Sequence, residues 1–203
     1  MKNVDYNRLM EKTVSELKTL KERKKLLLHT CCAPCSSACI ERLKDDFDIT
    51  AYFYNPNMDT AEEYFYRAEE QKRLCEAFNV NLVVENYKPN EFYSAVLGLE
   101  NQPEGGSRCL KCFELRLSKT ANYAKENGFD YFTTTLTVSP LKNARVLNEI
   151  GMEVAKVNDV NFLNSDFKKK NGYARSVELS NIHRLYRQNY CGCVFSKNLI
   201  PKG

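Results

Sequence analysis

The sequence predicts a single α/β domain whose mostly parallel, Rossmann-like sheet is covered by helices on both faces. Two observations predict this fold. Short apolar runs alternate with longer segments of helical period, and no repeat, low-complexity tract or linker divides the 203 residues. A third observation concerns the site: Cys31 and Cys32 follow directly on the first apolar run. Ligands of open parallel sheets bind at the carboxyl edge of the strands, so we expect the functional site there.

Five runs are predicted as strands because they are short, apolar and bounded by turn residues. The first, around Leu26-Leu27-Leu28, has the continuous apolar character of a buried strand, and Asn55-Pro56-Asn57 stops the second. The threonine-rich segment 133–137 ends the fourth, at the same sheet edge as the first cysteines. The predicted strands are 26–30, 49–54, 81–87, 131–134 and 159–163.

Helices are predicted between the strands from apolar spacing and from end signals. Pro34 and Ser139-Pro140 suit the first turn of a helix, and either Asp59 or Thr60 can cap another. Gly128 stops the helix that begins at the second group of cysteines. The predicted helices are 6–23, 34–44, 61–78, 90–98, 112–127, 139–150 and 174–182, and the tail 185–203 is predicted to be irregular.

Composition indicates a globular protein that stays in the cytosol. No apolar run is long enough to span a bilayer, and the polar N-terminus lacks the apolar stretch of a secretory signal. We therefore expect a cytoplasmic protein with no membrane partner. Thiols are kept reduced there, so clustered cysteines indicate metal binding or catalysis rather than a disulfide scaffold.

The basic charge is concentrated near the C-terminus. The net charge is +4, and residues 168–187 carry six basic residues and one acid. A local excess of this kind is what phosphate contacts need, although a solvated helix face with a basic loop has the same composition. The basic residues are Lys168, Lys169, Lys170, Arg175, Arg184 and Arg187.

Seven of the nine cysteines lie in three tight clusters, and the other two, Cys39 and Cys75, are interpreted as small core residues. The seven are Cys31, Cys32 and Cys35, then Cys109 and Cys112, then Cys191 and Cys193. Two thiolates from each of the first two clusters make four, which is enough for a tetrahedral zinc or for a 4Fe–4S cluster. We favour the iron–sulfur cluster, because one half of the site is an adjacent pair at a strand end, where an α/β protein does chemistry.

Two sulfur positions leave alternatives open. Cys35 lies one helical turn from the first pair, close enough to bind a second iron or simply to pack. Cys191-Gly-Cys193 closes a very small, strained ring as a disulfide, which suits an exchangeable two-electron couple; a further pair of metal ligands is the alternative.

Four ordered motifs resemble the QueH family of epoxyqueuosine reductases, over about residues 24–197. They are Leu28-His29-Thr30-Cys31-Cys32-Ala33-Pro34-Cys35-Ser36, Arg108-Cys109-Leu-Lys-Cys112-Phe-Glu-Leu-Arg116-Leu117, Ser165-Asp166-Phe167-Lys168-Lys169-Lys170-Asn171-Gly172-Tyr173, and Leu185-Tyr186-Arg187-Gln188-Asn189-Tyr190-Cys191-Gly192-Cys193. The helix within 1–23 lies outside the resemblance, so we divide the chain into an N-terminal helix, 1–23, and an α/β iron–sulfur catalytic domain, 24–203, that includes the basic segment.

The resemblance implies an oxidoreductase that removes the epoxide oxygen of epoxyqueuosine in tRNA to give queuosine, without cobalamin. By match it implies Cys31, Cys32, Cys109 and Cys112 as ligands of a 4Fe–4S cluster, an additional iron beside that cluster with Cys35 as a plausible ligand, and Cys191 and Cys193 as a redox-active disulfide.

The mechanism that fits these residues begins with docking of the anticodon arm on Lys168, Lys169, Lys170, Arg175 and Arg187, after which the modified base enters the pocket. An iron held beside the cluster would supply a Lewis acid for the epoxide oxygen, and we expect an electron-donor protein to reset the site. Two alternatives are a tRNA-binding protein with structural zinc and a thiol–disulfide oxidoreductase that uses Cys191 and Cys193 alone. An ATP-dependent tRNA thiolase is disfavoured, because no phosphate loop follows the first strand.

Overall fold

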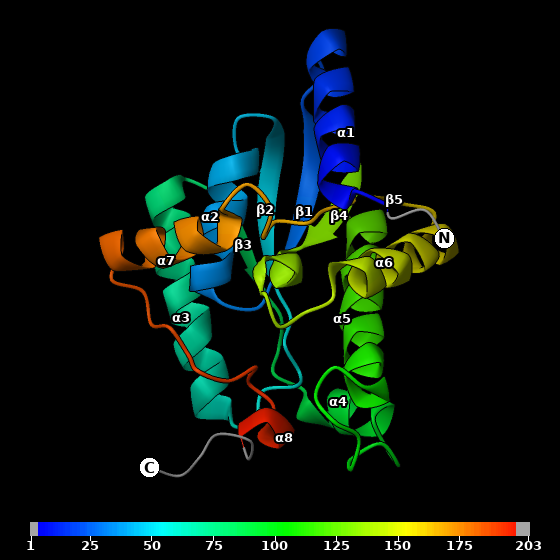
Figure 1. The fold of residues 1–203 in the computed structure, drawn as a ribbon, viewed down its shortest axis with the longest axis vertical. Helices are drawn as coiled ribbons and strands as arrows, with labels where there is room; N and C mark the ends of the chain where they lie inside the picture. Colours follow the sequence, from blue (N-terminus) through cyan, green and yellow to red (C-terminus); the bar gives the residue numbers. More distant parts are fainter. Residues whose placement is uncertain (1–3, 198–203) are drawn as a thin grey trace.

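One sheet of five parallel strands organises the computed structural model, which describes residues 4–197 (Figure 1). The strand order is β3-β2-β1-β4-β5, and every neighbouring pair is parallel. The predicted single α/β domain with a parallel, Rossmann-like sheet is therefore confirmed. The strands are β1 (Lys24–Thr30), β2 (Phe47–Phe53), β3 (Asn81–Val84), β4 (Tyr131–Thr134) and β5 (Asn161–Phe162).

Helices cover both faces of the sheet. In Figure 1, α2, α3 and α7 lie on one side of the strands, and α5 and α6 lie on the other. The helices are α1 (Tyr6–Leu20), α2 (Ala33–Leu43), α3 (Ala61–Phe78), α4 (Pro89–Ala95), α5 (Ser107–Glu126), the 3-10 turn η1 (Thr135–Val138), α6 (Ala144–Asn158), α7 (Gly172–Ile182) and α8 (Val194–Lys197). No helix among residues 4–197 is both long and apolar enough to cross a membrane.

The central strand β1 separates two hydrophobic cores. Leu26 and Leu28 point into the core that contains α2, while Leu27 points into the core under α5. This alternation follows from the two-residue period of a strand, and all three leucines are fully buried. The N-terminal helix α1 contributes Met10 and Leu17 to the first of these cores. The division of the chain near residue 24 stays a prediction.

Several element boundaries differ from the prediction. No helix begins at Ser139-Pro140; these residues follow η1 and form a turn closed by the Lys142 N–H and the Ser139 carbonyl, and α6 begins only after Asn143, which caps it by accepting from two backbone N–H groups. The side chain of Thr60, rather than that of Asp59, caps α3. The predicted helix 112–127 begins earlier, at Ser107, so both of its cysteines lie within the helix. The tail contains the short helix α8, and 198–203 lie outside the described residues.

Candidate functional site

The first cysteine pair lies where the strand order reverses. The chain runs from β1 outward through β2 to β3 and then returns to the other side of β1 with β4, so β1 and β4 flank the switch point. Cys31 and Cys32 follow β1, and Thr135 follows β4. The Cys31 Sγ lies 3.7 Å from the Thr135 Oγ1. The expected site at this edge of the sheet is therefore where the sulfurs are.

Cys31, Cys32 and Cys35 form a compact sulfur cluster, with all three Sγ atoms within 4.8 Å of one another. Adjacent side chains diverge within a strand, but Cys31 and Cys32 lie between the end of β1 at Thr30 and the start of α2 at Ala33, where the chain turns from strand to helix. The Sγ atoms of Cys31 and Cys32 are 3.7 Å apart. The first turn of α2 brings Cys35 back to the same place, so the triad has the spacing of a metal site.

The three thiols of this triad do not ionise alike. Hydrogen bonds from Cys32 and Cys35 stabilise a thiolate on Cys31 and hold its pKa well below the ordinary value. The same interaction raises the pKa of Cys32 to about 12, and it also raises the pKa of Cys35. One thiolate with two thiol donors is thus the favoured state of the bare triad, and binding of a metal cation favours release of the remaining protons.

The second cysteine pair lies on α5, whose first turn follows Gly106. Cys109 and Cys112 are three residues apart and therefore share a helix face, and the backbone N–H of Gly105 donates to the Cys109 Sγ at 3.3 Å. Burial raises the pKa of the Cys109 thiol, and it raises that of Cys112 to about 12. Neither thiol ionises readily by itself in this position.

Two cavities bring the three cysteine clusters together. The smaller one, of about 130 Å³, is lined by Cys109, Cys112, Cys191 and Cys193. The larger one, of about 440 Å³, is lined by Cys31, Cys32, Cys35 and Cys191. Cys191 and Lys142 line both, and the sulfur of Cys191 raises the pKa of Lys142, whose ammonium group is thus kept charged between the clusters.

The ligand set predicted from the sequence is gathered around these cavities, with one distinction. Of the described residues, only the triad has its sulfurs close enough together for a single ion. Cys109 and Cys112 lie across the adjoining cavity and are not part of that compact group. All seven clustered cysteines are free thiols, Cys191 and Cys193 included. A shared four-sulfur cage and a Cys191–Cys193 disulfide stay predictions.

Arg116 is a buried cation beside these sulfurs. It lies one turn after Cys112 on the same face of α5 and is 1% exposed. Its Nη2 donates to the Asn55 Oδ1 at 2.5 Å, and its Nε donates to the His29 Nε2 at 3.3 Å. Its electrostatic partners include the sulfurs of Cys112, Cys31 and Cys191. A permanent positive charge in this position favours thiolates and any anionic group that they hold.

His29 supports Arg116 and is not among the residues that line the two cavities. It is fully buried in β1, and its Nδ1 lies 2.9 Å from the Thr134 Oγ1. Burial, together with the charge of Arg116, lowers the pKa of His29 to about 3, so the ring is neutral and can accept from that guanidinium.

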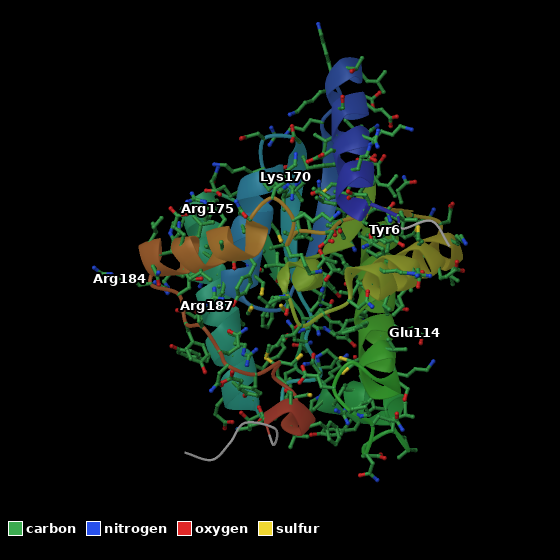
Figure 2. The ribbon with its side chains drawn as sticks, viewed as in Figure 1. Tyr6, Glu114, Lys170, Arg175, Arg184 and Arg187 are labelled. Carbon is green, nitrogen blue, oxygen red and sulfur yellow. The ribbon has the colours of Figure 1, made fainter. Side chains whose placement is uncertain are left out.

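The five basic residues predicted to contact tRNA do not lie together. Arg187 lines the larger cavity. Arg175 forms a two-pronged ion pair with Glu41 at 2.7 and 2.8 Å, and Lys168 pairs with Asp166. Figure 2 shows Lys170 and Arg187 well apart, and Lys169 and Lys170 pair with the acids Asp5 and Glu11 near α1. Contact with tRNA stays a prediction for all five.

Sequence reasoning missed several site residues. Arg116 carried a usable signal, since it follows Cys112 by four residues in a predicted helix, the spacing that places both on one face. Lys142 had no such signal, because its segment was predicted as helix and is a loop. Asp59 and Arg67 were also missed as supports of the last cysteine pair. The Asp59 backbone N–H donates to the Gly192 carbonyl at 2.9 Å, and the Arg67 guanidinium lies 5.1 Å from the Tyr190 ring centre.

Comparisons with known proteins agree on one family. A family described as "Epoxyqueuosine reductase QueH" matches residues 26–199. Proteins of that name from Staphylococcus epidermidis and Streptococcus pyogenes are each 44% identical to this chain, over 97% of it and over 87% and 79% of their own lengths. The Thermotoga maritima protein of that name is 36% identical over 84% of this chain and 89% of its own length.

One solved structure also shares the fold. The U34-tRNA thiolase NcsA from Methanococcus maripaludis, with its 4Fe-4S cluster, matches with a TM-score of 0.59. The match covers 94% of this chain and 67% of that chain at 15% identity. At that identity the likeness shows a common fold and does not bear on the chemistry.

Proposed function

Because the chain belongs to the QueH family of epoxyqueuosine reductases, we propose that its two cysteine-lined cavities are where it removes the epoxide oxygen of epoxyqueuosine in tRNA to give queuosine. Family membership makes the protein an oxidoreductase. The observation that carries the assignment of the site is the meeting of three cysteine clusters around two cavities that share Cys191 and Lys142, at the switch point of the sheet.

The donor set fits an iron–sulfur centre. Cys31 and Cys32 at the end of β1, with Cys109 and Cys112 at the start of α5, supply four soft sulfur ligands from two rigid elements. Cys35 is the fifth sulfur and the candidate ligand of an additional iron. The raised pKa values of Cys32, Cys35 and Cys112 mean that these thiols need a nearby metal cation to ionise. When bound, a 4Fe–4S cluster supplies single electrons, and an adjacent iron supplies a Lewis acid.

The proposed reaction, removal of the epoxide oxygen, is a two-electron reduction. Both carbon–oxygen bonds of the epoxide break, a carbon–carbon double bond forms, and the oxygen leaves as water with two protons. Oxidation of the Cys191–Cys193 dithiol to a disulfide releases two electrons and two protons, which matches this demand. We propose that these two cysteines are the redox pair, that no cobalamin takes part, and that an external electron-donor protein returns the disulfide to the dithiol.

The two cysteines of that pair have different surroundings. Cys191 is partly exposed and lines both cavities, next to Lys142. Cys193 is 7% exposed and packs in the cluster with Phe92, Val96 and Cys112. An external donor therefore reaches Cys191 first, and Cys193 is the internal sulfur that leaves when the disulfide opens.

The basic residues serve tRNA docking in this proposal. Arg187 is the one of the five at the rim of the sulfur cavity, so it contacts the nucleotides nearest the modified base. Arg175 and Lys168–Lys170 lie earlier in the same basic segment. Each forms an ion pair with an acidic residue, and this ion pair must break before the side chain can contact a phosphate. Docking should accordingly weaken steeply with added salt.

The decisive experiment combines metal analysis with turnover. Iron, sulfide and zinc are quantified in anaerobically reconstituted protein, which is then assayed on tRNA that carries epoxyqueuosine. We expect the absorption of a 4Fe–4S cluster and conversion to queuosine, both lost in Cys109→Ala. Cys75→Ala, which changes a core cysteine on α3, is the matched control and should keep both. Zinc bound by four sulfurs without iron, or iron loading without conversion of the epoxide, would contradict the proposal.

A further inference from the structure

The lining of the two sulfur cavities carries an excess of positive charge. Among the described residues, four basic residues line one or both cavities, and Glu104, which is exposed, is the only acid that does so. The four are Arg108, Arg116, Lys142 and Arg187. Glu104 can offset one of these charges at most. The lining therefore keeps a net positive charge unless the clustered sulfurs are ionised.

Arg116 is a buried cation that forms no ion pair with any carboxylate of residues 4–197. The residue is 1% exposed, and its hydrogen bonds reach two neutral groups, the Asn55 amide oxygen and the His29 ring. Arg67, which is 2% exposed, instead pairs with Glu63. A buried guanidinium that has no anion beside it is costly, because its charge loses the solvation of water. The sulfurs that line the larger cavity with Arg116 are, once ionised, the anions that can compensate it.

Lys142 places a second cation of this kind between the cavities. It lies on the turn between η1 and α6, where its backbone N–H donates to the Ser139 carbonyl at 3.2 Å. The residue lines both cavities, but its ammonium group has no ion pair or hydrogen bond with any of the described residues. Its electrostatic partners are sulfurs, first that of Cys191 and then that of Cys31, and they raise the pKa of the ammonium group. Lys142 therefore faces the cysteines rather than a carboxylate.

We infer that Arg116 and Lys142 are the built-in counter-charge of the sulfur-ligated centre and that they raise its reduction potential. The inference rests on the proposed function, because it takes four of these sulfurs as ligands of an iron–sulfur cluster. Both residues act through charge, and neither is inferred to be a ligand.

The sign of the effect follows from the charge of such a centre. A cluster held by four thiolates is an anion, and each electron that it takes up from the external donor adds one negative charge. Fixed cations in a buried site attract the reduced state more strongly than the oxidised state, so they make reduction easier. At an effective dielectric constant of about 20, a unit charge about 10 Å away changes the equilibrium constant for reduction on the order of 10-fold.

The test measures the midpoint potential of the cluster, separately from turnover. Anaerobically reconstituted, full-length protein is titrated with dithionite in the presence of redox dyes while the visible absorption of the cluster is followed. In Lys142→Met, the equilibrium constant for reduction should fall on the order of 10-fold, a midpoint potential about 59 mV lower for one electron. Lys142→Arg, which keeps the charge, should stay close to wild type. Arg116→Gln should shift the potential in the same direction as Lys142→Met, and Lys142→Met decides alone if the buried substitution prevents folding.

Lys111→Met is the matched control. Lys111 lies on α5 between Cys109 and Cys112, but its side chain is 54% exposed and the residue lines neither cavity. Solvent screens its charge, so the equilibrium constant for reduction should stay within about 2-fold of wild type.

The outcomes separate this inference from the proposed function. A midpoint potential that is the same in wild type and Lys142→Met overturns the inference, whether or not the wild-type protein reduces the epoxide. An equal shift in Lys142→Met and Lys142→Arg also overturns it, because such a shift reports altered packing rather than lost charge. Wild-type protein that holds the cluster and shows the expected shifts, but does not reduce the epoxide, overturns the proposed function alone. Zinc in place of the cluster overturns both.

Discussion

Asp59 should control access to the buried sulfur of Cys193. Its carboxylate joins the loop after β2 to the C-terminal cysteine segment: Oδ1 accepts from the Tyr190 hydroxyl at 3.1 Å, and Oδ2 accepts from the Lys197 Nζ at 2.8 Å. The backbone N–H of Asp59 also donates to the Gly192 carbonyl. Asp59→Ala removes both side-chain contacts and leaves the backbone bond, so the segment should undock locally without unfolding the sheet.

The expected size of the effect follows from the exposure of the two partners. The Lys197 side chain is 54% exposed, so its ion pair with Asp59 contributes at most about 1 kcal/mol. The Tyr190 hydroxyl donates to a charged acceptor, which contributes about 1.5–3 kcal/mol. Together, roughly 2–3 kcal/mol of docking free energy is lost, which raises the population of the undocked segment about 30- to 150-fold.

The assay is the alkylation rate of Cys193 in reduced, full-length protein, measured by peptide mass spectrometry. Asp59→Ala should raise that rate by one to two orders of magnitude while the melting temperature stays close to wild type. Asp59→Asn, which keeps an acceptor for Tyr190, should have a smaller effect. Asp48→Ala is the control, since Asp48 is exposed on β2 and has no side-chain bond to any residue of the described chain. An unchanged rate in Asp59→Ala would refute the reasoning and show that the segment is held elsewhere.

Three further predictions concern the supports of the site. Gly172→Ala should lower the free energy of unfolding by about 1–3 kcal/mol, because the added Cβ would lie 1.8 Å from the Phe167 carbonyl oxygen; an unchanged melting temperature would contradict the tight approach. Glu41→Gln should lower the melting temperature by no more than about 2–4 °C at neutral pH, since the ion pair with Arg175 is partly exposed. Arg175 holds the pKa of Glu41 below its ordinary value, so the difference in melting temperature between wild type and Glu41→Gln should vanish as the pH falls through that lowered pKa. A difference in melting temperature that persists in acid would show that the ion pair is not its cause. Gly192→Ala should slow disulfide formation by Cys191 and Cys193, because φ at Gly192 is +112°, a backbone angle that residues with a side chain rarely adopt. Oxidation of the pair at the wild-type rate would show that the alanine causes no such strain.

Much of the fold was predictable because it depends on local patterns. The period of the apolar residues and the position of the turn residues located every strand, and the helix 61–78 was predicted with the bounds that the structure has. The predicted helix start at Ser139-Pro140 was wrong. A Ser-Pro pair has helix-start chemistry, but here the Ser139 Oγ accepts from the Leu141 N–H within a turn, and the helix begins only after Asn143, whose side chain accepts from two backbone N–H groups.

The candidate site was predictable only in part. Spacing within each cysteine cluster indicated a sulfur site, since thiols so close in sequence have a chemical use. The local excess of basic residues was less informative. In the sequence, Arg175 and Lys168–Lys170 are available cations, whereas in the structure each is paired with an acidic side chain. Glu41, Asp5 and Glu11 lie far in the sequence from Arg175, Lys169 and Lys170, so no local pattern reveals those pairs; only the second partner of Arg175, Glu178, is a sequence neighbour.

What the sequence determined by itself is therefore the order of strands and helices along the chain, the presence of a cysteine-rich site and the family, because periodicity, thiol chemistry and ordered motifs are properties of neighbouring residues. What only the tertiary structure decided is which groups meet: Arg116 with three of the sulfurs, Lys142 between two cavities, and Tyr173 and Gln188 in the lining of the cavity that the triad also lines. Those encounters join residues up to 157 positions apart, from Cys31 to Gln188, and they are set by the crossover of β1 and β4 and the return of the C-terminal segment over the sheet edge.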